Sequence, residues 1–142
     1  MKTKFSEILK VRKEKVSEIE RKLASMRAQK AQTEGGIAEI QSQIAQHAIP
    51  GKGDYALMQE ALATKRFLQR DKQQKENMLK YFEQEINTLN ILYKEASLEY
   101  EKIKHLHSVE IEKVVEMQKR EEAKRLDEIA SQLFSRNQKG TA

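Results

Sequence analysis

The chain has 142 residues, of which 35% are charged and 38% hydrophobic, with no cysteine and no tryptophan. This composition excludes a disulfide framework and a cysteine-based zinc site, and it is poor in apolar volume for a compact globular core. There is no stretch of roughly 20 apolar residues that would cross a membrane and no signal-peptide pattern in MKTKFSEILKVRKEK, so we expect a cytoplasmic protein.

The first predicted element is a basic helix over about residues 3–48. Residues 1–30 contain ten Lys or Arg and four Asp or Glu, a net charge of +6, whereas the remaining 112 residues sum to −1. Alternating steps of four and three residues from Phe5 to His47 meet apolar side chains at nine of thirteen positions, which is the seven-residue repeat of a coiled coil. The repeat weakens before Gly35 and Gly36, each of which lowers helix propensity by about 1 kcal/mol. We expect one helix with a weak point there.

The stretch HAIPGKGDYALMQ, residues 47–59, holds the only proline of the chain. Pro50 disfavours helix at the preceding residue, and Gly51 and Gly53 allow the chain to reverse, which predicts a turn over residues 49–53. The GKG sequence lacks the Ser or Thr that follows the lysine of a phosphate-binding loop, and no strand is expected before it. We therefore expect a structural turn, with Asp54 capping the next helix.

A second helix is predicted from about residue 54 to residue 138, because no proline or glycine lies between Gly53 and Gly140. Its apolar residues recur at coiled-coil spacing. The two seams match when the chain folds back on itself so that facing residue numbers sum to about 101, with Ile44 opposite Met58 and Ile19 opposite Phe82. The sequence therefore predicts an all-α protein in which two long helices form an antiparallel coiled-coil hairpin, a single domain over residues 1–142. A dimer of extended chains would use the same seams.

In this register the second helix is longer and overhangs, and residues 97–138 have no partner within the chain. An uncovered apolar stripe on a helix predicts binding of another protein or of a second copy in a homodimer; a frayed tail is the alternative. The residues that we expect to bind a partner are Tyr100, Ile103, Leu106, Val114, Met117, Leu126, Ile129 and Leu133.

Catalytic and metal-binding patterns are absent from the sequence. His105 and His107 are two residues apart, so on a helix they point about 200° away from each other and do not share a metal ion. Carboxylates are spread along charged faces, without the buried pair that acid-base catalysis needs. We expect no enzyme, no cofactor and no metal. A basic hairpin that binds RNA is a rival interpretation, but acidic residues interrupt the basic face and no aromatic stacking platform accompanies it; we expect no nucleic acid.

Two stretches carry a resemblance to a known family. EEAKRLDEIASQLFSR at 121–136 is similar to the C-terminal pattern of the flagellar FliJ family, and DYALMQEALATKRFLQR at 54–70 resembles the start of the second helix in that family. The chain departs from the family in having no tryptophan and in carrying a proline in its turn. The resemblance implies a non-catalytic coiled-coil component of bacterial type III protein export, similar to the central stalk of rotary ATPases.

The resemblance also implies partners: the hexameric export ATPase, the membrane export-gate protein and export chaperones, met at the flagellar base on the cytoplasmic side. Apolar positions early in the second helix match those used at the export gate, and both terminal segments match the region offered to the ATPase. A generic coiled-coil scaffold or a secretion chaperone of another pathway is the alternative. The residues that the resemblance assigns are Tyr55, Met58 and Leu62 for the gate, and Arg12, Lys13, Lys15, Leu126, Ile129 and Leu133 for the ATPase.

Overall fold

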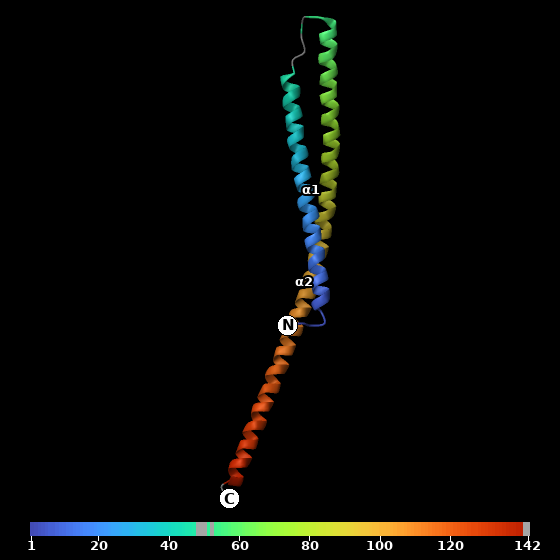
Figure 1. Ribbon diagram of the computed structural model, residues 1–142. Helices are drawn as coiled ribbons and strands as arrows, with labels where there is room; N and C mark the ends of the chain where they lie inside the picture. Colours follow the sequence, from blue (N-terminus) through green and yellow to red (C-terminus); the bar gives the residue numbers. More distant parts are fainter. Residues whose placement is uncertain (48–50, 52, 141–142) are drawn as a thin grey trace. The chain divides into compact units, whose positions relative to one another are not determined.

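A computed structural model describes residues 1–47, 51 and 53–140 of the chain, with the side chains of 139 and 140 left aside. Two helices account for nearly all of these residues: α1, Ser6–Gln46, with 41 residues, and α2, Tyr55–Gly140, with 86 residues. The predicted all-α fold is confirmed, and the two helices pack against each other (Figure 1). The expected turn conformation at Ile49 and Pro50 lies outside the described residues.

The start of α1 is held by a reciprocal pair of backbone-to-side-chain hydrogen bonds. The Phe5 amide donates to Thr3 Oγ1 at 3.1 Å, and the Thr3 amide donates to Ser6 Oγ at 2.8 Å. This arrangement resembles a capping box, in which two amides without helical partners are satisfied by side chains. Further along, α1 continues through Gly35 and Gly36 without interruption, as the sequence predicts.

The start of α2 depends on Asp54, as predicted. Asp54 Oδ1 accepts from the Ala56 amide at 3.3 Å, and the Asp54 carbonyl accepts from the Met58 amide at 3.2 Å. Gly53, directly before this cap, has a φ of +150°, a backbone conformation that residues with a Cβ rarely adopt. The second helix therefore begins where a carboxylate satisfies its first free amide and a glycine allows the chain to enter.

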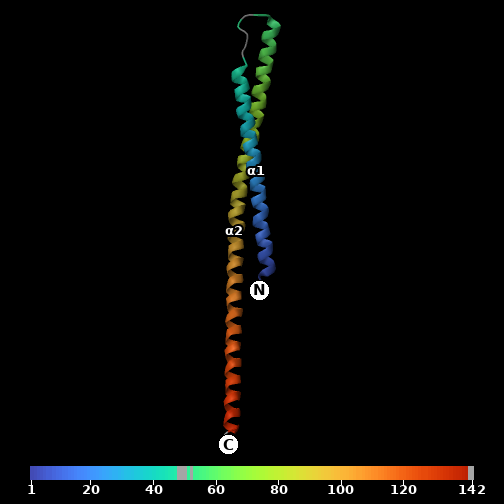
Figure 2. The ribbon, with the colours of Figure 1, turned by 60° about the vertical axis from the view of Figure 1, so that its left-hand side comes forward.

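The chain divides into two compact units, of which the first is Lys15–Ala96. Within this unit α1 and α2 lie side by side in both ribbon views (Figure 1, Figure 2). Its core is a single layer of side chains between two helices, centred on Ile19 and Leu23 of α1 and Leu89 of α2, which are 5%, 5% and 8% exposed. Burial of such side chains stabilises the pairing by about 1.5–3 kcal/mol each. Half-buried residues complete the layer: Met26, Ile86, Tyr93 and Ala96.

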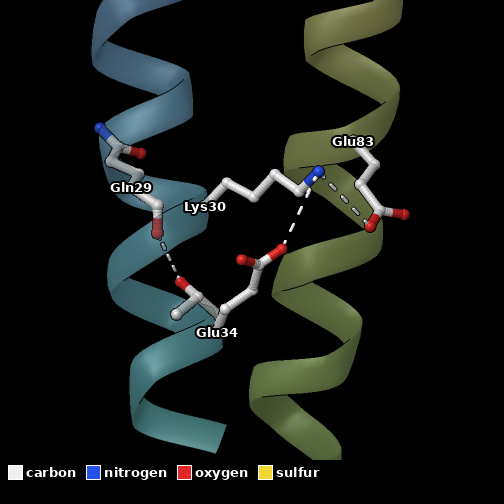
Figure 3. A network of polar contacts seen from close by, with 5 residues as sticks. Gln29, Lys30, Glu34 and Glu83 are labelled. Atoms are coloured by element: carbon white, nitrogen blue, oxygen red, sulfur yellow. Dashed lines mark hydrogen bonds and ion pairs between the residues drawn. The ribbon is translucent and has the colours of Figure 1, made fainter.

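The middle of this unit is polar. Lys30 Nζ lies 4.0 Å from Glu83 Oε1 on the facing helix and 3.9 Å from Glu34 Oε1 on its own helix (Figure 3). The buried Thr33 side chain donates to the Gln29 carbonyl at 2.8 Å, which satisfies its hydroxyl within α1. These partly exposed ion pairs are each worth less than about 1 kcal/mol, so the apolar layer and not the charges holds the helices together.

The register predicted from the sequence is wrong. In three contacts between α1 and α2 within this unit, the two residue numbers add up to between 108 and 113, whereas the sequence predicts a sum of about 101. Three contacts define the observed register: Tyr93 Oη donates to Glu20 Oε1 (3.4 Å), Lys30 Nζ pairs with Glu83 Oε1 (4.0 Å), and His47 Nε2 donates to the Ala61 carbonyl (3.0 Å).

The shift follows from the seven-residue repeat itself, because seams that repeat every seven residues also match after a slide of one or one and a half repeats. The predicted contact of Ile44 with Met58 is therefore not made, and Ile19 packs in the cluster of Leu89 and not against Phe82. Since His47 lies beside Ala61, the first turns of α2 extend past the end of α1, and every described side chain from residue 55 to residue 60 is exposed.

The second unit contains Met1–Glu14 and the chain from Ser97 onward. Here Thr3 Oγ1 forms a hydrogen bond of 2.7 Å with His107 Nδ1. The expectation that residues from 97 onward have no partner in the chain is therefore wrong as far as His107, and the correction has the same cause as the register shift. All described side chains from residue 116 to residue 138 are exposed.

Candidate partner-binding surfaces

The last part of α2 carries a row of exposed apolar side chains, which we call the C-terminal stripe: Leu126, Ile129, Leu133 and Phe134. They are 66%, 53%, 53% and 65% exposed. Their spacing of three, four and one residues places them on one face of the helix. A contiguous row of large exposed apolar side chains is typical of a protein-protein interface. Met117, also predicted as a binding residue, is 61% exposed but lies nine residues before Leu126.

The predicted residues nearer the middle of α2 are less accessible. Tyr100, Ile103 and Val114 are half-buried, and Leu106 is 44% exposed. The Lys104 ammonium lies 5.9 Å from the centre of the Tyr100 ring, a cation–π contact that covers part of its face. Leu126, Ile129 and Leu133 are therefore more accessible than the predicted residues of α2 between residues 100 and 114.

A second exposed surface lies at the start of α2. Tyr55 and Met58 are 73% and 38% exposed, whereas Leu62 is half-buried. This surface is open because of the observed register, in which α1 ends beside Ala61. Leu57, which is 55% exposed, was not among the predicted residues.

The predicted basic residues of α1 differ in accessibility. Lys13 and Lys15 are exposed, but Arg12 is half-buried, and its Nε atom is buried without a hydrogen-bond partner in the described part of the chain. An arginine at a seam position tends to bury its aliphatic stem and keep part of its guanidinium in water, and the intermediate exposure of Arg12 agrees with this. The two lysines are the accessible cations of this predicted site.

One acidic residue that interrupts the basic face is neutralised locally. Glu18 Oε1 lies 3.3 Å from Lys22 Nζ. The hydrogen bond and the charge of Lys22, followed by the charges of Lys15 and Arg21, lower the pKa of Glu18 from its usual value. Because opposite charge nearby favours the ionised carboxylate, Glu18 stays negative and offsets part of the positive potential of α1.

Several large exposed side chains were not predicted as binding residues. Phe67 is 69% exposed, and Tyr81 and Ile91 are 54% and 60% exposed, all on α2. Phe67 directly precedes the seam residue Leu68, so the period of the seam assigned it to the flank. An aromatic side chain next to a seam, on a helix with only one neighbour, was the signal that could have identified it.

The two neighbouring histidines, His105 and His107, differ in their surroundings. His107 contacts Thr3, whereas His105 is exposed. Within residues 1–47, 51 and 53–140 no group of three or more His, Cys, Asp or Glu side chains is placed to hold a metal ion. In the same residues neither helix combines the length and the apolar character needed to cross a membrane.

Comparison with known proteins adds one match. The family described as flagellar FliJ protein matches residues 1–139 of the chain. No curated protein and no solved structure gave a significant match. The matched range covers both helices and both exposed surfaces described above. The chain therefore belongs to the flagellar FliJ protein family.

Proposed function

We propose that this protein is a non-catalytic coiled-coil component of the bacterial flagellar type III export apparatus that binds and stimulates the export ATPase. Membership of the FliJ family gives it an export-related role in building the flagellum, and members of that family are export components and not enzymes. The proposal adds to this family role a particular architecture, a set of partners, a location and a set of binding residues. One observation carries it: the C-terminal stripe, with four large apolar side chains each more than half exposed.

The proposed working form is an antiparallel coiled-coil hairpin, one domain in all, whose longer second helix projects beyond the first. The polar face of such a helix suits a location in the cytoplasm, beside the membrane at the flagellar base. The stripe and the exposed lysines at 13 and 15 would meet the ATPase hexamer together. Rim charges of this kind steer association, whereas buried apolar anchors hold the complex.

Tyr55, Met58 and Leu62 form the proposed contact with the membrane export-gate protein. Tyr55 is the most exposed of the three, at 73%, and tyrosine supplies a large contact area at low entropic cost. The C-terminal stripe and Tyr55 both lie on α2, which leaves the remaining exposed face of that helix for export chaperones. The protein would then link the ATPase, the gate and the delivery of export substrates without doing chemistry itself.

The test is a pull-down with purified export ATPase, combined with an ATPase assay. Leu126→Asp with Ile129→Asp places two charges in the stripe, and we expect loss of binding by about tenfold or more together with loss of stimulation, because two apolar anchors are removed. The matched control is Ser131→Asp with Ser135→Asp, which adds the same two charges to the opposite face of the same helix segment.

The ATPase assignment would be refuted if neither the unaltered protein nor the control bound the ATPase. Equal loss in both double variants would show that charge and not the stripe matters. For the gate contact, Tyr55→Ala with Met58→Ala is compared with Leu57→Ala, an exposed apolar residue about 200° around the helix from Tyr55. We expect only the first variant to lose binding to the isolated soluble part of the export gate.

A further inference from the structure

The apolar face of α2 is interrupted by two residues of opposite charge. Going along the helix in steps of four or three residues from Ile111, the face presents Val115, then Lys119 and Glu122, and then Leu126. Lys119 and Glu122 are both exposed, and neither has an ion-pair partner in the described part of the chain. A charged pair in the middle of an apolar seam is a typical device for selecting one partner and one orientation.

The order of these residues makes the face complementary to itself. When two copies of the helix lie antiparallel and facing residue numbers sum to 241, Lys119 of each copy faces Glu122 of the other. In the same register Val115 faces Leu126, and Ile111 faces Ala130, so apolar layers lie on both sides of the charged ones. We propose that residues 111–130 bind the same residues of a second copy in this antiparallel arrangement.

The charges exclude the parallel alternative. In a parallel, in-register pair Lys119 would face Lys119 and Glu122 would face Glu122, and like charges facing each other in a partly desolvated seam are costly. On the flank of the seam, Glu116 of one copy lies beside Ala123 of the other. This flanking pair does not bring like charges together, which agrees with the antiparallel register. Opposite charges face each other only when the two chains run in opposite directions.

The pairing fits the free length of α2. Thr3 contacts His107, which is one turn before Ile111, so this contact of the N-terminal segment lies just before the residues that the second copy would bind. Residues 111–130 provide about five and a half helical turns at 3.6 residues per turn. That is short for a coiled coil, and we expect a reversible dimer.

The dimer would bury Leu126, which is 66% exposed in the single chain. This inference does not depend on the proposed ATPase contact, but the two share part of a surface. Self-association would therefore compete with any other protein that binds the C-terminal stripe, and the protein would be stored as a dimer with this surface covered.

The test measures the mass of the full-length protein by sedimentation equilibrium over a range of concentrations. We expect Lys119→Glu and Glu122→Lys each to weaken the dimer by about tenfold or more, because each places two like-charged pairs in the seam. An equimolar mixture of the two variants restores opposite charges at both positions and should form a heterodimer. Lys124→Glu, about 140° around the helix from Lys119, makes the same charge change away from the seam and should leave the dimer unchanged.

Cross-linking determines the orientation, without background because the chain has no cysteine. Val115→Cys mixed with Leu126→Cys should give a disulfide between unlike chains on mild oxidation, and Val115→Cys alone should give little. A parallel pair would instead cross-link Val115→Cys with itself, which would refute the proposal. It is also refuted by a monomer at all concentrations, or by failure of the charge-reversed mixture to associate while circular dichroism shows that both variants are helical.

Discussion

Truncation of Leu89, which is 8% exposed and packs with Ile19 and Leu23, should lower the free energy of unfolding substantially. Replacement by alanine removes the transfer free energy of the lost methyl and methylene groups and leaves space between the helices. Buried leucines lose about 2–5 kcal/mol on such truncation. Because the core here is one layer that is open on both flanks, its neighbours can relax into the space, and we expect about 2–3 kcal/mol.

Leu98 provides the matched control. It is the same residue type on the same helix, but it is 63% exposed. The change in helix propensity from leucine to alanine is the same at both positions, so the difference between the variants reports burial. We expect Leu98→Ala to lose less than about 1 kcal/mol.

Urea unfolding followed by circular dichroism at 222 nm measures both losses. With a slope of about 1–2 kcal/mol per molar urea, the midpoint of Leu89→Ala should fall by about 1–3 M, and that of Leu98→Ala by less than about 1 M. Equal losses for the two variants would contradict the packing of Leu89 between the helices and with it the observed register.

Three smaller effects follow from the same structure. Gly35→Ala should stabilise α1 by about 0.5–1 kcal/mol, because nothing lies within 4 Å of the added Cβ. Gly36→Ala should stabilise it less, because its Cβ would lie 3.0 Å from a lysine side chain of α2. Thermal unfolding of the two variants tests this difference, and equal gains would contradict it. A double-mutant cycle on Lys30 and Glu83, which are 4.0 Å apart and partly exposed, should give a coupling below about 1 kcal/mol that disappears at high salt; a larger, salt-insensitive coupling would show a buried pair. Asp54→Ala removes the cap of α2 and should cost about 1 kcal/mol in urea unfolding, with Asp54→Asn close to the original protein; an equal loss for asparagine would show that charge and not the cap matters.

The sequence was sufficient for the elements and insufficient for their alignment. Helix periodicity, Asp54 as a cap and the continuity of α1 through Gly35 are local properties, determined by residues within a few positions of one another. Register is a property of two distant segments, and a seven-residue repeat offers several nearly equivalent alignments. Polar contacts such as Lys30 with Glu83 distinguish between them, but each is worth too little to identify from sequence.

The candidate surfaces show the same division. The apolar positions of the C-terminal stripe could be recognised from their spacing, because any face of the helix that lacks a neighbour stays exposed. Tyr100 and Ile103 were expected on an uncovered segment and are half-buried, because the register error placed the end of α1 too early. The accessibility of Tyr55 and Leu57, in turn, depends on where His47 contacts α2.

In the segment of α2 from residue 116 to residue 136 every side chain is exposed, so no buried side chain supports the helix there. An isolated helix of this length is only marginally stable in water, but here the preceding turns supply the nucleus, and only propagation toward the C-terminus is required. Its amide protons should therefore exchange with solvent progressively faster toward the C-terminus, while those near Leu89 exchange only when the helices separate. Hydrogen–deuterium exchange along this one segment would then report, residue by residue, when a partner is bound and how far along the helix it reaches.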